Sequence, residues 1–352
     1  MAKTFYGIDI QGSLYIERLS SHPTPEGGRI YNYTVDGKLW ACADGTANQR
    51  IVQEDGDDYN IDITGAADSA KFAIAGFPYE KGYITSGYTG ILYLRDTEEY
   101  DFDVWSSRTD TPLPARNFGA ASTILNKGYI YGGQSAGQDC DEYDPDVWTQ
   151  KTNMPTPSRR QLAASTILNK GYIYGGRNLV KDCDEYVPDS WANKTDMPSP
   201  ARYGLTASTI NDKGYIYCGY GPGIRILDCD EYDPDSWTSK TNAPSPGRER
   251  AGGTTINDKG YIFGGYTAIS LADTDEYSPD TWISKTDLPS PTRHDMGTTT
   301  INHKGYIFYG FTYNPAQLYY SNTDEYSPDT WINKTDAPSS ARSGTGSFSI
   351  SS

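Results

Sequence analysis

The sequence is poor in positive charge, in histidine and in long hydrophobic runs, and each shortage argues against a class of function. Its 352 residues include 30 Lys and Arg against 46 Asp and Glu, a formal net charge of -16, whereas a nucleic-acid surface needs clustered basic residues. The three histidines, His22, His294 and His303, are too scattered to supply a copper site. No apolar run approaches the roughly 18 to 20 residues that cross a bilayer, and residues 1–7 do not lead into the apolar core of a signal peptide. We therefore expect no nucleic-acid partner, no membrane insertion, no metal and no cofactor.

The cysteines give no sign of a zinc site or of a disulfide framework. Their number is odd, and no two stand in Cys-x-x-Cys spacing. Three of them precede Asp-Glu-Tyr at the same place in a repeat, and equivalent positions of neighbouring units are usually farther apart than the roughly 7 Å between Cα atoms that a disulfide allows. We predict free, half-buried thiols at Cys42, Cys140, Cys183, Cys218 and Cys229.

The chain contains one sequence pattern that is repeated six times between residues 82 and 342. Each copy runs Gly-Tyr-Ile, an aromatic residue, a small or Gly pair, a variable stretch, Glu-Tyr, Trp, Pro and Arg. A period in the forties made of short strand-like pieces predicts stacked four-stranded units, because one unit cannot bury both of its faces alone. We expect the segment before Gly-Tyr and the Gly-Tyr segment to form a hairpin, Glu-Tyr to lie on a third strand and Trp on a fourth.

The repeats resemble a known family. Tyr-Ile-Tyr-Gly-Gly at 129–133 and 172–176, Glu-Tyr-Asp-Pro at 142–145, Trp148 and the closing Pro-x-x-Arg segment are similar to kelch repeats, which form the blades of β-propellers. The resemblance implies an all-β fold with a six-bladed kelch-type β-propeller over residues 69–352. Its repeats would span about 70–116, 117–159, 160–202, 203–248, 249–293 and 294–342, and a closing strand would follow at 343–352. Three copies depart from the double glycine, and we expect small local adjustments at Ser86, Cys218 and Tyr309.

The spacing of Arg and Ile predicts how the ring closes. An Arg precedes an Ile by eight residues in successive copies, as in Arg116 and Ile124, and the spacing recurs at Arg342 and Ile350. The C-terminal segment is therefore expected to enter the first blade as its inner strand, a place that residues 70–78 fit poorly. A seventh blade that borrows strands from the N-terminal region is the alternative.

Residues 1–68 contain no such repeat. Residues 23–32 (Pro-Thr-Pro-Glu-Gly-Gly-Arg-Ile-Tyr-Asn) and 36–40 (Asp-Gly-Lys-Leu-Trp) resemble a small module found near the N-terminus of many tailed-phage fibre and other virion proteins, although residues 31–33 read Tyr-Asn-Tyr where Tyr-Tyr-Asn is usual. The resemblance implies a β-rich module and linker over residues 1–68, a location on the virion, and contact with other virion proteins through Ile30, Tyr31, Leu39 and Trp40.

Several groups recur in every repeat, and we interpret them as structural. The arginines would bond carbonyls of the neighbouring blade, with a ring that attracts an anionic ligand as the alternative. The acids, as in residues 139–142, are interpreted as a solvated strand edge, with calcium binding as the alternative. The tryptophans would be apolar wedges between blades.

Function is expected in the stretch that varies, between the second and third strands of each unit. These loops should share a face with the arginines, and their Tyr and amide side chains suit sugars or protein surfaces. The candidate ligand-binding residues are Tyr88, Tyr93, Arg177, Tyr220, Arg225, Tyr266, Tyr313, Asn314, Tyr319 and Tyr320.

No catalytic motif accompanies these loops, so we expect no enzyme. The sequence favours a phage virion structural or adhesion protein, of the tail-fibre, spike or decoration kind, that binds a host-surface glycan or protein. A prokaryotic kelch-repeat interaction scaffold unrelated to a virion is the alternative, and homo-oligomer formation is left open.

Overall fold

The chain divides into two compact units, Met1–Tyr79 and Glu80–Ser352. The computed structural model describes residues 79–351 except Asn314, Pro315 and Pro328, and in the first unit the backbone of six strands. The predicted boundary at residue 68 and the poorly fitting segment 70–78 lie outside the described residues. The part of the chain that is described has no helix long and apolar enough to cross a membrane.

The first unit is a six-stranded sheet in the order β1-β2-β3-β4-β5-β6. Strands β2 and β3 are parallel, and the neighbouring pairs from β3 onward are antiparallel. Tyr31 on β3 pairs with Trp40 on β4 through the backbone, while the side chains of the predicted attachment residues lie outside the described part. The strands are β1 (Phe5–Asp9), β2 (Ser13–Leu19), β3 (Arg29–Tyr33), β4 (Lys38–Cys42), β5 (Gln49–Gln53) and β6 (Tyr59–Asn60).

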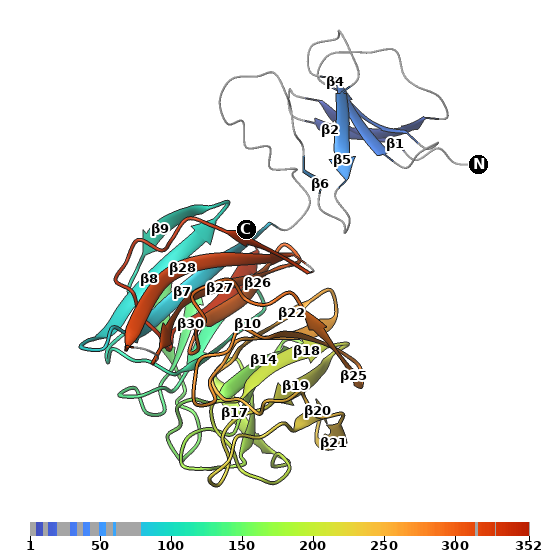
Figure 1. Ribbon diagram of the computed structural model, residues 1–352. Helices are drawn as coiled ribbons and strands as arrows, with labels where there is room; N and C mark the ends of the chain where they lie inside the picture. Colours follow the sequence, from blue (N-terminus) through green and yellow to red (C-terminus); the bar gives the residue numbers. More distant parts are fainter. Residues whose placement is uncertain are drawn as a thin grey trace. The chain divides into compact units, whose positions relative to one another are not determined.

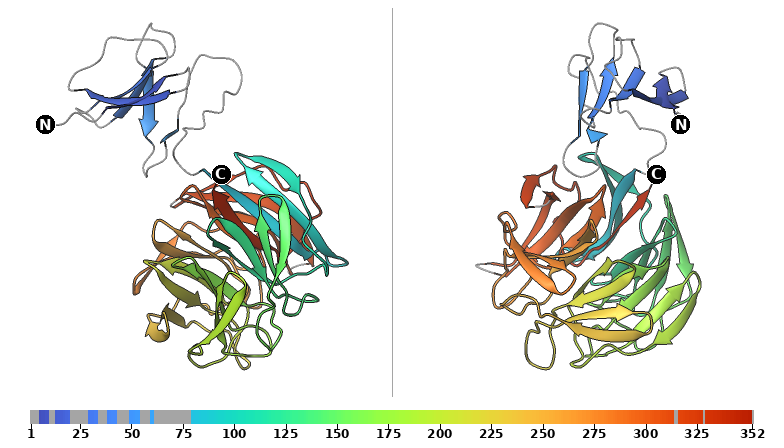
Figure 2. Two further views of the ribbon diagram at one scale, coloured as in Figure 1. Left: turned by 180° about the vertical axis from the view of Figure 1, so that it is seen from behind. Right: turned by 90° about the vertical axis from the view of Figure 1, so that its right-hand side faces the viewer.

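The second unit is a six-bladed β-propeller (Figures 1 and 2), so the expected all-β architecture is confirmed. Every blade is a four-stranded antiparallel sheet. Blade 1 consists of β30 (Gly346–Ser351), β7 (Glu80–Tyr88), β8 (Tyr93–Asp101) and β9 (Val104–Arg108). Blade 2 consists of β10 (Ala120–Ile124), β11 (Lys127–Tyr131), β12 (Cys140–Asp144) and β13 (Val147–Lys151). Blade 3 consists of β14 (Ala163–Ile167), β15 (Lys170–Tyr174), β16 (Cys183–Val187) and β17 (Ser190–Lys194).

The remaining three blades follow the same order, inner strand first. Blade 4 consists of β18 (Thr206–Ile210), β19 (Lys213–Tyr217), β20 (Cys229–Asp233) and β21 (Ser236–Lys240). Blade 5 consists of β22 (Gly252–Ile256), β23 (Lys259–Phe263), β24 (Thr274–Ser278) and β25 (Thr281–Lys285). Blade 6 consists of β26 (Gly297–Ile301), β27 (Lys304–Thr312), β28 (Leu318–Ser327) and β29 (Thr330–Asn333).

The C-terminal strand closes the ring, as the Arg–Ile spacing predicts. Strand β30 pairs with β7 in blade 1, with Phe348 opposite Tyr83, and the two strands run side by side in Figure 1. Each inner strand contacts the next around a closed circle that includes β26, β30 and β10. Residues 80–351 thus form six blades, and the alternative with a seventh is wrong.

The Gly-Tyr motif repeats because neighbouring blades approach closely at the glycine. A Cβ at Gly171 would lie 2.5 Å from the hydroxyl of Tyr131 on the preceding blade, and a Cβ at Gly128 would lie 2.1 Å from the Phe348 ring. Both distances are far below van der Waals contact, so only glycine leaves room for these aromatic side chains. The motif therefore encodes blade packing.

The tryptophans act as wedges between blades, as predicted. Trp148 is half-buried, packs on Tyr143 with ring centroids 5.0 Å apart, and donates its indole N–H to the carbonyl of Thr109 in the preceding connection, at 2.9 Å. The same bond to a threonine carbonyl is made in the other five blades by Trp105, Trp191, Trp237, Trp282 and Trp331.

The recurring arginines are structural, but their main partner differs from the prediction. All six are fully buried, and each guanidinium forms an ion pair with a carboxylate on the third strand of the next blade rather than with carbonyls alone. The Arg248 carbonyl also accepts a 2.9 Å bond from Gly219 of the preceding blade, so one residue ties two blades together. The pairs are Arg116–Asp141, Arg159–Asp184, Arg202–Asp230, Arg248–Asp275, Arg293–Asp324 and Arg342–Glu98.

The interpretation of the recurring acids as a solvated strand edge is therefore wrong. Asp141 and Glu142 are both buried, because their strand lies inside a sheet that has another blade on either side. Burial alone would raise the pKa of Glu142, but hydrogen bonds from Tyr129 and Lys127 and the charge of Lys151 hold it below its usual value. Side chains alternate between the two faces of a sheet, but where other blades cover both faces, this alternation does not distinguish exposed from buried positions.

The cysteine prediction is half right. Cys140, Cys183, Cys218 and Cys229 are free thiols, but they are fully buried rather than half-buried. Burial raises the pKa of each, to about 11 for Cys218. Cys42 has no described side chain.

The three departures from the double glycine need only local change. Ser86, Cys218 and Tyr309 adopt φ values of 63°, 57° and 60°, close to the 58° of Gly132.

Candidate ligand-binding site

Three positions in each blade converge on one face of the propeller, around its axis. The first is the residue after each recurring arginine, which we call the entry position. The second is the next residue, the floor position, and the third is the residue after the glycine pair, the wall position. Entry and wall positions are joined through the backbone, as in the bridges between Asn117 and Gln134, between Tyr203 and Tyr220, and between His294 and Phe311. The connections and the variable loops therefore share a face, as predicted.

The floor positions form a closed ring of backbone hydrogen bonds. Each floor residue donates its N–H to the carbonyl of the floor residue in the preceding connection, at 2.6 to 3.0 Å, and Phe118 completes the circle by donating to Gly344. All six have left-handed φ values, between 53° and 66°. The ring is Phe118, Gln161, Gly204, Arg250, Asp295 and Gly344.

A cavity of about 360 Å³ lies above this ring and is open on the loop face. Its base includes the floor residues Phe118, Gln161, Arg250 and Asp295. Wall and entry residues and two of the variable loops supply the remainder, in particular Tyr88, Tyr93, Asn117, Gln134, Arg160, Arg177, Phe311, Tyr313, Gln317, Tyr319 and Ser343. The volume is in the range of sites for small ligands. Of the described residues, six aromatic side chains line the cavity together with nine polar or charged ones, so its lining is more polar than that of a typical small-ligand pocket.

Aromatic rings follow the edge of the cavity in an almost continuous arc. Tyr93 and Tyr88 of blade 1 lie 5.0 Å apart, Tyr88 meets Tyr319 at 6.2 Å, and Tyr319 packs on Phe311 at 4.6 Å. The arc continues through Tyr313 and His294 to Tyr266, with centroid distances of 4.5 to 5.5 Å. Such rings offer flat apolar contact together with hydroxyl groups at their edges.

Arginines extend this arc around blades 3 to 5. The Arg225 guanidinium lies between two wall tyrosines, 5.7 Å from the ring centroid of Tyr220 and 5.0 Å from that of Tyr266. The Arg177 guanidinium lies 5.0 Å from the ring centroid of Tyr203. Cation–π contact thus holds two long side chains in defined positions on the face.

Buried charged groups lie beneath one side of the cavity. Arg250 and Asp295, neighbours in the floor ring, approach to 3.5 Å between Nη1 and Oδ2. Burial raises the pKa of Asp295 to about 6, against the opposing charge of Arg250. Burial, together with Arg250, lowers the pKa of His294 to about 3, so its ring is neutral near pH 7. Its Nδ1 lies 2.9 Å from the Ser270 hydroxyl, and its Nε2 has no hydrogen-bond partner among the described residues.

The structure brings together half of the predicted site residues. Tyr88, Tyr93, Arg177, Tyr313 and Tyr319 line the cavity. Tyr220, Arg225 and Tyr266 lie beside it, in the cation–π group, and Tyr320 lies on β28 outside the lining. Asn314 is outside the described residues.

Sequence reasoning missed the entry and floor positions. The signal was present, since the two residues after the recurring arginine read Asn-Phe, Arg-Gln, Tyr-Gly, Glu-Arg, His-Asp and Ser-Gly in chain order. No two of these pairs are the same, although the segment around them is repeated, and only glycine occurs twice at the second position. Variation at an otherwise fixed place is the pattern of a scaffold that presents different side chains from identical backbone positions.

The fold and the face together define a β-propeller with a cavity at its centre. A comparison with known protein families finds no match, and neither does a comparison with curated proteins. Among solved structures, the chain is similar to that of YjhT, with a TM-score of 0.60 over 68% of this chain and 88% of that chain. At 16% sequence identity, this likeness shows the fold alone.

Proposed function

We propose that this protein is a structural and adhesion protein of a bacteriophage virion whose propeller, of the kelch type, binds a host-surface glycan or protein through the loop face. The observation that carries the proposal is the open cavity on that face, at which tyrosines from blades 1 and 6 meet arginines from blade 3 and its entry connection. Aromatic rings can stack on sugar rings, and the paired N–H donors of arginine can bond the hydroxyl groups of the sugar. The protein acts by binding rather than by catalysis.

In this proposal the first unit attaches the protein to other virion proteins, through Ile30, Tyr31, Leu39 and Trp40. The support is the likeness of residues 23–40 to virion modules, together with the pairing of Tyr31 with Trp40 on adjacent strands. The protein would then lie on the surface of the particle. Antibodies raised against the full chain should label intact particles in electron microscopy, and particles that carry no label while the protein remains in the infected cell would contradict this part.

A kelch-repeat interaction scaffold without a virion is the second candidate. It is favoured by apolar side chains at the loop tips, which suit a protein partner better than a sugar. Ile91 is 85% exposed, and Leu92 and Ile224 are more than 60% exposed. This candidate predicts a stable complex with a protein of the same cell, and no attachment to the surface of other bacteria.

Two adjacent tyrosines provide a matched test of adhesion. Tyr319 lines the cavity, whereas the side chain of Tyr320 does not. Binding of the labelled full chain to a panel of bacterial strains should identify strains that it attaches to. On these strains Tyr319→Ala should weaken attachment about tenfold or more, because aromatic anchors supply most of such binding energy, and Tyr320→Ala should leave attachment close to the parent. Equal effects of the two changes, or no attachment to any strain, would contradict the proposal.

A further inference from the structure

Two arginines of the loop face lack the acidic partners that Arg225 and Arg250 have on the same face. Arg225 forms an ion pair with Glu249 at 3.1 Å, and Arg250 lies within 3.5 Å of both Glu249 and Asp295. Arg160 and Arg177 have no carboxylate within ion-pair distance among the described residues. In a chain with 46 acidic against 30 basic side chains, two neighbouring uncompensated arginines are an exception.

The two arginines are held next to each other by the backbone. Arg160 is an entry residue and Arg177 the wall residue that pairs with it, and the Arg177 N–H donates a 2.8 Å bond to the Arg160 carbonyl. Burial and the like charge of Arg177 lower the pKa of Arg160. Arg177 is positioned by its contact with the Tyr203 ring and by a 3.4 Å bond to the Gln161 side chain. Like charges on neighbouring side chains repel each other, and an anion between them would relieve that repulsion.

A second cavity adjoins these arginines. It has a volume of about 330 Å³, and Arg160, Arg177 and Gln134 line both this cavity and the central one. Its lining also includes the short polar side chains of Ser135, Ser158 and Asn178, and Arg159, whose guanidinium is ion-paired with Asp184. The lining therefore combines guanidinium groups with hydroxyl and amide groups, which suits an acidic group on a polyhydroxylated ring. The central cavity, lined by tyrosines, offers the neighbouring space for an uncharged sugar.

We propose that Arg160 and Arg177 bind the anionic group of an acidic saccharide, with the charged sugar in the polar cavity beside them and the adjoining sugar against the tyrosines of the central cavity. This inference rests on the proposed function and specifies the ligand class of the same face. The shared chemistry is a carboxylate or a sulfate group on a sugar, either of which accepts paired N–H donors from arginine.

Calorimetric titration of the full chain with three oligosaccharides of matched length tests the proposal. The probes are oligogalacturonate, which carries carboxylates, a carrageenan oligosaccharide, which carries sulfates, and a neutral maltooligosaccharide. The parent should bind at least one of the two anionic probes more tightly than the neutral one, and the tighter of the two identifies the acidic group. Binding should weaken as NaCl rises from about 0.05 to 0.5 M, because the contact is partly exposed to solvent.

Matched variants locate the site. Arg160→Gln and Arg177→Gln should each weaken binding of the anionic probe about tenfold or more, since hydrogen bonds to charged groups are the strong ones. Arg160→Lys should recover part of the binding, because it keeps the positive charge but not the paired N–H donors of the guanidinium. Lys127→Gln removes the same charge at the opposite end of blade 2, on a side chain that is 36% exposed. This variant should bind the anionic probe as the parent does. Thermal unfolding of each variant excludes loss of fold as the cause.

The outcomes separate this inference from the proposed function. If neither anionic probe binds the parent, or if both Gln variants bind as the parent does, the acidic-saccharide site is wrong. If, in addition, cell attachment is still lost in Tyr319→Ala, adhesion through the face stands and its ligand is uncharged. If the chain attaches to no strain yet binds an anionic probe in an Arg160-dependent way, the site is upheld and the adhesion function fails.

Discussion

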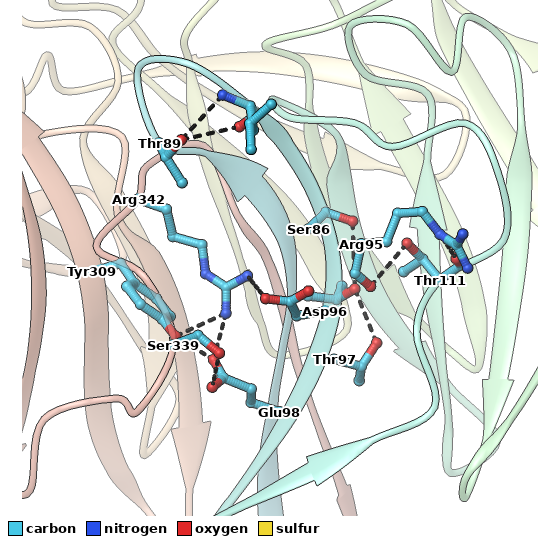
Figure 3. A network of polar contacts seen from close by, with 12 residues as sticks. Ser86, Thr89, Arg95, Asp96, Thr97, Glu98, Thr111, Tyr309, Ser339 and Arg342 are labelled. Carbon is cyan, nitrogen blue, oxygen red and sulfur yellow. Dashed lines mark hydrogen bonds and ion pairs between the residues drawn. The ribbon is translucent and has the colours of Figure 1, made fainter.

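The guanidinium of Arg342 lies over the ring of Tyr309, with 4.5 Å from Cζ to the ring centroid, and donates a 2.8 Å hydrogen bond to its hydroxyl. Both groups also bond Glu98, which stands where the other blades have aspartate, and Asp96 lies 3.5 Å from the same guanidinium (Figure 3). Tyr309 occupies a place that is glycine in three other blades. The junction between blade 6 and blade 1, where the two ends of the propeller meet, therefore has its own version of the arginine contact.

This junction should be sensitive to the loss of one charge. Arg342→Ala leaves Glu98 buried without its ion pair, and the free energy of unfolding should fall by about 3–5 kcal/mol. Arg95→Ala is the control, because Arg95 is partly exposed and its side chain donates to the carbonyl of Thr111, so the change should cost about 1 kcal/mol or less. Urea unfolding measures both. Similar values for the two variants would mean that the Arg342 contact does not stabilise the closure.

Substitution of Phe348 tests how much side-chain packing, rather than charge, contributes to closing the propeller. Its ring lies 5.6 Å from that of Tyr83 in blade 1 and 5.8 Å from that of Tyr143 in blade 2. Phe348→Ala should lower the free energy of unfolding by about 3–5 kcal/mol, because it removes a fully buried aromatic side chain. Ser349→Ala on the same strand should change it by less than about 0.5 kcal/mol. Deletion of residues 343–352 should destabilise still more, and a deletion variant that melts like the parent would refute closure by this strand.

His294 and Asp295 should change the pH dependence of the free energy of unfolding in opposite directions. The pKa of His294 falls from 6.5 to about 3 on folding, so the unfolded chain binds more protons in that interval and acidification from pH 6.5 destabilises the protein. The pKa of Asp295 rises from 3.8 to about 6, so the folded state binds the extra proton and acidification from pH 6 to 4 stabilises it. His294→Gln should therefore make the loss of stability toward pH 4.5 shallower, and Asp295→Asn should make it steeper. Denaturant unfolding between pH 4.5 and 7.5 measures the slopes, and a shift in the same direction for both variants would contradict these assignments.

The buried thiols should be unreactive in the folded protein. Cys140, Cys183, Cys218 and Cys229 are at most 1% exposed, and burial raises the pKa of each thiol, so little thiolate is accessible. Treatment with iodoacetamide near pH 8 should leave these four peptides unmodified, and treatment in denaturant should modify them all. Mass spectrometry of the digested protein distinguishes the two states. Rapid labelling of Cys218 in the native protein would show that blade 4 opens locally.

The sequence predicted the strands better than their surroundings. The order of strands within a blade and the Trp wedge follow from short-range pattern, and both are found. Asp141 was expected in solvent because its neighbours alternate along a strand, but each blade is covered on both sides and the guanidinium of Arg116 compensates its charge. The burial of Cys140 was underestimated for the same reason. Burial in a propeller depends on the neighbouring blade, which lies some forty residues away in the chain.

The candidate site shows the same division. The loop tyrosines that line the cavity, such as Tyr88 and Tyr319, could be named from sequence because the loops differ between repeats. The entry and floor residues, such as Arg160 and Asp295, were missed although they vary between copies, because their variation points to a site only once the six connections are known to meet at one axis.

By itself the sequence predicted the strand order and the closure by the C-terminal strand, because these depend on a repeated local pattern and on one recurrence of the Arg–Ile spacing, but it left six and seven blades open. Only the tertiary structure decided which residues share the cavity and which arginines lack a counter-charge. The physical reason is that the floor residues hydrogen-bond to one another only when the ring is closed, and this closure brings side chains from distant connections to one place.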